Sequence, residues 1–203
     1  KRVTNGGNPE NEYVVQPAFT KTEENNIKTF DYGEWKDELT GLWIGKYESS
    51  IIDKKSKQII KTVNESLGNI IIDKNNNTDK AITVIPNVTT WFYVDVGNMY
   101  TSAKAFSEKL NSHMIKNSEW GVVAYLTHSQ YGRNGNEIAT NNSGITNDEF
   151  YTTGISAGKP DATIDETKYQ YNTDQGVLAS STGNIYGVYD LSGGGWEITT
   201  GYY

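Results

Sequence analysis

The chain has 203 residues, a formal net charge of −7 and no cysteine. The lack of cysteine excludes disulfides, thiolate metal sites and a cysteine nucleophile, and the acidic balance argues against a nucleic-acid or anionic-membrane partner. The 14 Tyr, 5 Trp and 5 Phe predict a core rich in aromatic side chains. No apolar run reaches the length of a membrane span, so we expect no direct membrane insertion.

The N-terminal quarter of the chain predicts a flexible start followed by two strands. Residues 1–11 are polar and rich in Gly and Asn, which predicts a flexible leading segment. The apolar run Glu12–Phe19 predicts a first strand. The two-residue alternation over Leu39–Glu48 predicts a second. With no internal repeat and no linker in the sequence, we expect a single domain over 12–203.

Residues 49–80 are expected to form an inserted hairpin, with strands around Gln58–Ile60 and Asn69–Ile72, because both runs are rich in β-branched residues. The segment Asp73–Asp79 resembles the start of a calcium loop. It lacks the glycine and the glutamate that an EF-hand needs at its sixth and twelfth positions, where Thr78 and Val84 stand. A solvated turn is therefore the favoured interpretation.

A first helix is expected after a short strand over Ile82–Asn87. Apolar residues at helical spacing begin directly after Asp95, which is the expected N-cap. The stripe expected to face the core consists of Val96, Met99, Tyr100, Ala103, Phe106 and Leu110.

A second, shorter helix is expected from Ser118 to about Thr127. Asn117 is its expected cap, and Glu119 would lie in the positive first turn. Its buried side is expected to consist of Trp120, Val123, Ala124 and Leu126.

The stretch Gly183–Glu197 combines glycines with large aromatic residues. This composition is untypical of a linker and predicts backbone with positive φ, or backbone that another group approaches too closely for a Cβ. We expect the apolar residues Ile185, Val188, Tyr189, Leu191 and Trp196 to be buried around these turns.

Catalytic motifs are absent from the sequence. It holds no nucleophile elbow, zinc-binding His-Glu-x-x-His or phosphate-binding glycine loop. His113 and His128 lie in polar contexts and are expected at the surface or at helix ends. Asp190 and Glu197 could form the carboxylate pair of a glycosidase, but we favour a role in hydrogen bonding at the glycine turn.

Four blocks, taken in order, resemble the sulfatase-modifying-factor family, also called the formylglycine-generating-enzyme family. They are Gly41–Glu48, Pro86–Trp91 with the helix after it, Met114–Tyr125 and Asn184–Glu197. The last block is the most specific, because Tyr-Asp-Leu-Ser-Gly-Gly-Gly-Trp-Glu is similar to the family's glycine-rich Trp-Glu motif. The resemblance implies an α+β, C-type-lectin-like fold of the formylglycine-generating-enzyme type, with two helices, short twisted antiparallel strands and long irregular loops.

The resemblance carries over a scaffold and not an activity. The family's catalytic cysteines have no counterpart here, and the iron-binding histidines of some relatives are not placed. Similar cysteine-free domains occur in pilin-like surface proteins of low-GC Gram-positive bacteria, and related lectin-fold domains occur in phage receptor-binding proteins. The resemblance therefore implies a non-enzymatic, extracellular recognition or adhesion module on a cell-surface or pilus-like structure.

The expected partner is a protein or carbohydrate ligand on another cell or a host surface. Tyrosine supplies rigid contact area and asparagine supplies adaptable hydrogen bonds, although the same side chains could simply pin a long loop to the domain. The expected contact residues are Tyr131, Asn134, Asn136, Phe150, Tyr151, Tyr169, Tyr171, Tyr202 and Tyr203.

The expected structural turn consists of Gly183, Asn184, Gly187, Asp190, Gly193, Gly194, Gly195, Trp196 and Glu197. No cofactor is expected. The sequence leaves open whether Asp190 and Glu197 bind a structural calcium ion.

A second function is kept as an alternative. The family continues past its Trp-Glu motif with further strands, whereas this sequence stops at Tyr203. Either the sequence is a fragment, or the closing strands come from elsewhere and a neighbouring chain could fill an open sheet edge. The chain would then be a structural subunit of a surface filament or a phage virion protein, assembled as a homo-oligomer or filament.

Overall fold

The computed structural model describes residues 41–141, 153–154, 169–195 and 197–199, together with the backbone of four short strands before them. β1 (Arg2–Thr4) pairs antiparallel with β2 (Glu12–Val14), and β3 (Glu23–Glu24) pairs antiparallel with β4 (Ile27–Lys28). β2 lies inside the predicted first strand. β1 lies within the leading segment that we predicted to be flexible.

β5 (Ser50–Asp53) and β6 (Lys80–Thr83) form a third antiparallel pair, in which Ser50 lies opposite Thr83. The predicted strands at 58–60 and 69–72 are wrong. Ile59 makes only an isolated bridge to Ile52, and the second run contributes no strand. The buried Ile72 donates its backbone N–H to Ser102 Oγ of the following helix at 2.9 Å, so this run is held by a helix and not by a neighbouring strand.

Residues 41–48 do not form the strand that we predicted over 39–48. Exposure does alternate over residues 41–46, where Trp43 is 97% exposed and its neighbours Leu42 and Ile44 are partly buried. No strand in the described residues pairs with this segment. Its glycines, Gly41 and Gly45, weaken a strand because they add chain entropy and no packing. A backbone hydrogen bond from Tyr189 N–H to Lys46 O, at 2.9 Å, ties the segment to the C-terminal part of the chain.

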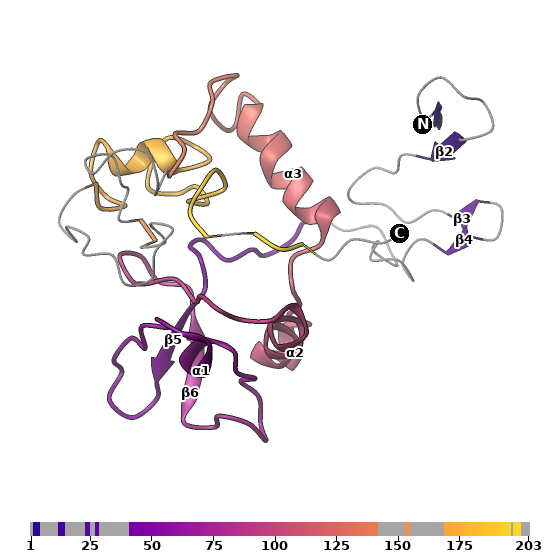
Figure 1. Ribbon diagram of the computed structural model, residues 1–203. Helices are drawn as coiled ribbons and strands as arrows, with labels where there is room; N and C mark the ends of the chain where they lie inside the picture. Colours follow the sequence, from indigo (N-terminus) through magenta and orange to yellow (C-terminus); the bar gives the residue numbers. More distant parts are fainter. Residues whose placement is uncertain are drawn as a thin grey trace.

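Both predicted helices form. α2 (Val96–Phe106) is followed by the short 3₁₀ turn η4 (Glu108–Leu110), and α3 is Asn117–His128. Figure 1 shows α2 and α3 as separate rods joined by the chain between them. α3 is capped from within, because the Glu119 carboxylate accepts the Lys116 N–H at 2.9 Å. Lys116, and not the predicted Asn117, is therefore the N-cap.

The predicted buried faces of the helices are largely wrong. In α2 the apolar side chains of Val96, Tyr100 and Phe106 are about half exposed, and the buried residue is Ser102. In α3, Leu126 is exposed, while Glu119, Val122 and Thr127 are buried. On α2 the buried Ser102 hydroxyl accepts the Ile72 N–H from another segment, whereas on α3 the Thr127 hydroxyl donates within the helix, to Val123 O at 2.8 Å.

The predicted aromatic core is confirmed in a cluster of Tyr47, Tyr189 and Ala179, against which Tyr171 packs. The rings of Tyr47 and Tyr189 stack at a centroid distance of 5.2 Å, and Tyr171 meets Tyr47 edge-on at 5.7 Å. The buried Tyr189 hydroxyl donates to the Tyr171 carbonyl oxygen at 2.6 Å. Burial raises the pKa of Tyr189 to about 12, so the phenol remains a neutral donor.

The glycine-rich run behaves as its composition predicted. Gly183, Gly193 and Gly194 have φ of +67°, +79° and +81°. A Cβ on Gly193 would lie 2.2 Å from Asn141 O, and one on Gly187 would lie 2.2 Å from Ser180 Oγ. The burial prediction for this run holds for Tyr189 and Leu191 and fails for the 40% exposed Ile185. Trp196 lies outside the described residues.

Gly193→Ala should destabilise the protein, because alanine resists positive φ and its Cβ would collide with the Asn141 backbone. We expect a loss of more than about 1 kcal/mol in the free energy of unfolding. Gly121→Ala is the matched control, since a Cβ at this position of α3 meets nothing within 4 Å and should stabilise by up to about 1 kcal/mol. Urea unfolding of both variants measures this, and equal stability of the two would contradict the assignment.

Candidate functional site

The carboxylate of Glu48 connects the segment before β5 to two distant parts of the chain. Thr90 Oγ1 donates to Glu48 Oε2 at 2.5 Å, and the Gly195 backbone N–H donates to Glu48 Oε1 at 2.6 Å. A Cβ on Gly195 would lie 3.1 Å from Glu48 Oε1, so the absence of a side chain there lets the carboxylate reach the backbone. Glu48 therefore fixes the end of the glycine-rich run.

Asp190 is fully buried, with a φ of +60°. Its Oδ1 accepts hydrogen bonds from Thr153 Oγ1 at 2.5 Å and from Asn141 Nδ2 at 3.1 Å, and its Oδ2 has no hydrogen-bond partner. A Cβ on Gly154 would lie 3.1 Å from both Asp190 Oδ2 and Glu48 Oε2, so both carboxylates lie beside this glycine. We call Glu48, Asp190, Asn141 and Thr153 the carboxylate hub.

The hub favours a protonated Asp190. Loss of solvation, and then repulsion by the nearby Glu48 carboxylate, raise the pKa of Asp190 to about 7, against the opposing hydrogen bonds from Thr153, Asn141 and the Gly154 backbone. A proton on Oδ2 removes a buried charge that has no cationic partner in the described residues. Near neutral pH Asp190 is thus divided between its neutral and ionised forms.

Burial, and then repulsion by the Glu48 carboxylate, raise the pKa of both predicted calcium ligands, Asp190 and Glu197, to about 7. Glu197 Oε2 accepts the indole N–H of Trp120, and no group of three or more His, Asp or Glu side chains within the described ranges is placed to hold a metal ion. A calcium ion at Asp190 and Glu197 stays a prediction from the family resemblance.

Three predicted contact residues lie in the turn that follows α3, residues 129–136. Tyr131 is 79% exposed, and the Asn134 and Asn136 side chains are also exposed. The turn is anchored to the helix end, because Arg133 N–H donates to Thr127 O at 2.6 Å and Gly135 N–H to His128 O at 2.9 Å. Its side chains thus project from a backbone that is held in place.

A second loop, residues 183–187, meets this turn at Arg133. Arg133 Nη1 donates to Leu178 O at 3.3 Å and would lie 3.2 Å from a Cβ on Gly183. Tyr186, in the same loop, is 83% exposed, and its N–H donates to Asn184 Oδ1 at 2.9 Å. We call residues 129–136 and 183–187 together the tyrosine loops.

Of the other predicted contact residues, the two that the structure describes, Tyr169 and Tyr171, are not exposed. Tyr171 packs in the aromatic core, and Tyr169 is half-buried with a φ of +52°. Phe150, Tyr151, Tyr202 and Tyr203 lie outside the described residues. Sequence analysis missed Arg133, Tyr186, Thr153 and Asn141. Only Tyr186 had a usable signal, because it is an aromatic residue between two turn-forming glycines.

Comparison of the chain with family models, with curated proteins and with solved structures gave no match. The family resemblance therefore remains a prediction. In the described ranges, no helix has both the length and the apolar character needed to cross a bilayer.

The raised pKa of Asp190 makes stability depend on pH in a defined direction. The folded chain holds this proton up to about pH 7, whereas an unfolded Asp loses it near pH 4. Between these values the folded state binds more protons, so the free energy of unfolding should fall as pH rises, by up to about 1.4 kcal/mol per pH unit.

Asp190→Asn should lessen this fall, because the amide is neutral at every pH and keeps an oxygen for Thr153 and Asn141. Part of the fall should remain, because burial also raises the pKa of Glu197 to about 7. Asp174→Asn removes an exposed carboxylate and should leave the pH dependence unchanged. Urea unfolding measured from pH 4 to 8 gives the slopes, and the Asp190→Asn curve running parallel to wild type would refute the assignment.

Proposed function

We propose that this chain is a non-enzymatic recognition module that acts outside the cell, on a cell-surface or pilus-like structure, and carries a C-type-lectin-like fold of the formylglycine-generating-enzyme type. The tyrosine loops form its contact surface. The expected ligand is a protein or carbohydrate on another cell or host surface.

The observation that supports this proposal most directly is the combination of exposed tyrosines with anchored backbone. Tyr131 and Tyr186 are 79% and 83% exposed, in two loops that meet at Arg133. Exposed tyrosines lose little conformational entropy on binding, and arginine and tyrosine are enriched at the centres of protein interfaces. A loop that only pinned itself to the domain would bury these rings.

The aromatic residues in the tyrosine loops also differ from those that stabilise the core. Tyr171 and Tyr189 pack against other rings, whereas Tyr131 and Tyr186 project into solvent. Removal of the exposed rings should therefore affect binding and leave folding intact.

Labelled chain applied to an array of host glycans and to intact host cells should bind, and Tyr131→Ala and Tyr186→Ala should each weaken that binding roughly tenfold. Phe106→Ala is the control, since Phe106 is a half-exposed aromatic residue on α2, and Figure 1 shows α2 apart from the turn that follows α3. Thermal melts should be unchanged for all three variants. Equal binding by both tyrosine variants and wild type would refute the contact surface.

The alternative function, a structural subunit of a filament or virion, is supported by one edge of the third sheet. β6 pairs with β5 on one side and has no strand partner on its other side within the described residues. Such an edge offers unpaired backbone groups to a second chain.

Assembly through this edge should make the molar mass depend on protein concentration. Sedimentation velocity over a wide concentration range should then show species larger than a monomer, and Ile82→Pro in β6 should reduce them by removing a backbone donor that faces away from β5. A monomer at every concentration would contradict the alternative and leave the recognition module as the supported function.

A further inference from the structure

A short run before β5 has the side-chain pattern of a strand and a backbone without strand partners. Residues 41–46 alternate between exposed and partly buried side chains, and Trp43 is the most exposed of them, which is the two-residue period of a strand. Within the described ranges, the backbone of residues 41–45 makes no hydrogen bond, and no strand pairs with it. We call residues 41–46 the Trp43 segment.

The Trp43 segment lies beside two further segments of the chain. The run 188–190 bonds to 179–181 through the backbone of its first and last residues, at 2.8 Å and 3.2 Å. Its middle residue, Tyr189, instead donates its N–H to Lys46 O. Because successive residues of an extended run bond to opposite sides, 188–190 lies between 179–181 and Lys46. The Trp43 segment is therefore an edge, to which a partner could add an extended strand.

Two cations contact the loop 183–187 next to this edge. Lys46 Nζ donates to Ile185 O, and Arg133 Nη1 would lie 3.2 Å from a Cβ on Gly183. Gly183 and Ile185 are two residues apart, so at most about 7 Å of chain separates the two points of contact. A single bound segment that crosses this loop could thus reach both cations.

These two cations have no acidic partner in the described part of the chain. Lys46 and Arg133 donate to carbonyl oxygens, and neither belongs to an ion pair there. The Trp43 segment and the tyrosine loops contain no Asp or Glu, although the whole chain has a net charge of −7. A positive surface of this kind attracts carboxylates of a partner.

The exposed aromatic residues beside the cations favour a protein as that partner. Trp43 precedes Lys46 by three residues, and Tyr186 directly follows Ile185 in the sequence. Trp, Tyr and Arg are the residue types that most often dominate the energy of protein interfaces. An edge with unpaired backbone groups recognises an extended polypeptide, because the polypeptide supplies matching N–H and C=O groups at each residue.

We propose that the Trp43 segment binds an extended, acidic segment of a partner protein, which pairs with its backbone and places carboxylates at Lys46 and Arg133. Apolar side chains of the same segment would pack on the Trp43 and Tyr186 rings. This inference rests on the proposed recognition function, to which it adds a second binding element and a class of partner. β6, the edge considered for filament assembly, takes no part in it.

The test uses the full chain labelled with ¹⁵N, titrated with a peptide of alternating valine and glutamate. The peptide should shift the amide signals of residues 41–47 and 183–187, and it should slow hydrogen exchange in the Trp43 segment, whose amides would gain acceptors. A counterpart with lysine in place of glutamate should leave these signals unchanged. Added salt should weaken the response, because partly exposed charges are screened.

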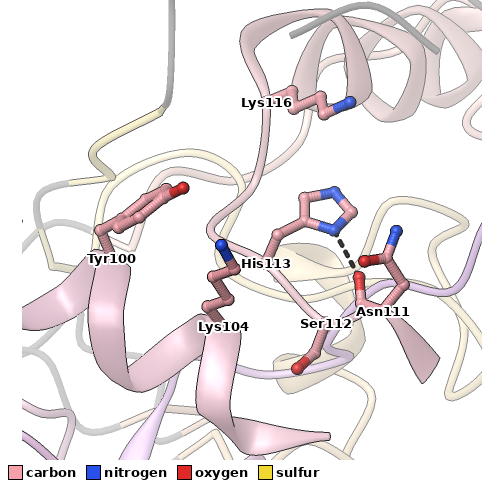
Figure 2. A pocket seen from close by; sticks show the side chains of 6 residues that line it. All are labelled: Tyr100, Lys104, Asn111, Ser112, His113 and Lys116. Atoms are coloured by element: carbon pink, nitrogen blue, oxygen red, sulfur yellow. Dashed lines mark hydrogen bonds between the residues drawn. The ribbon is translucent and has the colours of Figure 1, made fainter. Parts of the chain in front are cut away.

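Trp43→Ala, Lys46→Gln and Arg133→Gln should each lower the affinity for the acidic peptide by about fivefold. Lys104→Gln is the matched control and should bind as wild type does. The Nζ atoms of Lys46 and Lys104 both lie 5.9 Å from the centroid of a tyrosine ring, but Figure 2 shows Lys104 beside Tyr100 on α2. Thermal melts report whether each variant is folded, and removal of the exposed Trp43 ring should leave the melt unchanged.

Three outcomes would overturn the proposal. The acidic peptide could leave residues 41–47 unshifted, or the lysine peptide could bind as tightly. Polygalacturonate, an acidic polysaccharide, could shift the same signals at lower concentration than the peptide, which would identify a glycan site.

The assays on cells and glycan arrays separate this inference from the recognition function. Cell binding that depends on Tyr131 and Tyr186, without any response to the peptide, would refute only the acidic partner. A peptide response without cell or glycan binding would instead count against the proposed function.

Discussion

The interior of this protein closes around the buried carboxyl group of Asp190. A carboxylate removed from water costs several kcal/mol unless it is paired or neutralised. Here hydrogen bonds from Thr153 and Asn141 offset part of that cost. Burial and the nearby Glu48 also favour a proton on Asp190, which removes its charge. The four residues come from separate segments of the chain, so the group that must be satisfied also determines where those segments meet.

Many of the residues that fill the described interior are polar. Ser50, Thr62, Ser102 and Ser180 are each 1% exposed or less, alongside the fully buried Ile51. Ser102 and Thr62 accept backbone N–H groups at 2.9 Å and 2.7 Å from segments that carry no regular structure. Hydrogen bonds impose direction where apolar packing does not, so they can hold irregular segments in defined positions. The exposed loops depend on this directional interior.

Sequence reasoning found the elements that depend on local chemistry. Both helices form where the apolar spacing predicts them, although other residues are buried on them, and the positive φ of Gly183, Gly193 and Gly194 follows from the composition of the glycine-rich run. Sequence reasoning failed where contacts between residues far apart in the sequence decide the local structure. The isoleucines of 69–72 were assigned to a strand, but a serine on α2 binds their backbone. The residues next to 69–72 in the sequence do not indicate whether a strand or a helix will bind this backbone.

The same difference between local and distant contacts explains which site residues could be predicted. Tyr131 could be found because an exposed tyrosine in a turn has a local signature, whereas Arg133 joins the two loops only because the folded chain brings Leu178 and Gly183 to it. Asp190 was placed in a structural turn, but its partners Asn141 and Thr153 lie 49 and 37 residues away. Pairing over such separations is visible only once the chain is folded.

The hydrogen bond between Glu48 and Gly195 spans 147 residues of sequence, and this separation affects how the protein reaches its native state. Bringing two distant residues together lowers the chain entropy before their contact contributes any stabilisation. Topologies rich in distant contacts therefore fold slowly. During synthesis, Glu48 leaves the ribosome long before Gly195 is synthesised. Residues that are buried in the folded protein lack their partners during that interval. A nascent chain of this kind would benefit from a chaperone, or from a compartment in which folding begins only after synthesis is complete.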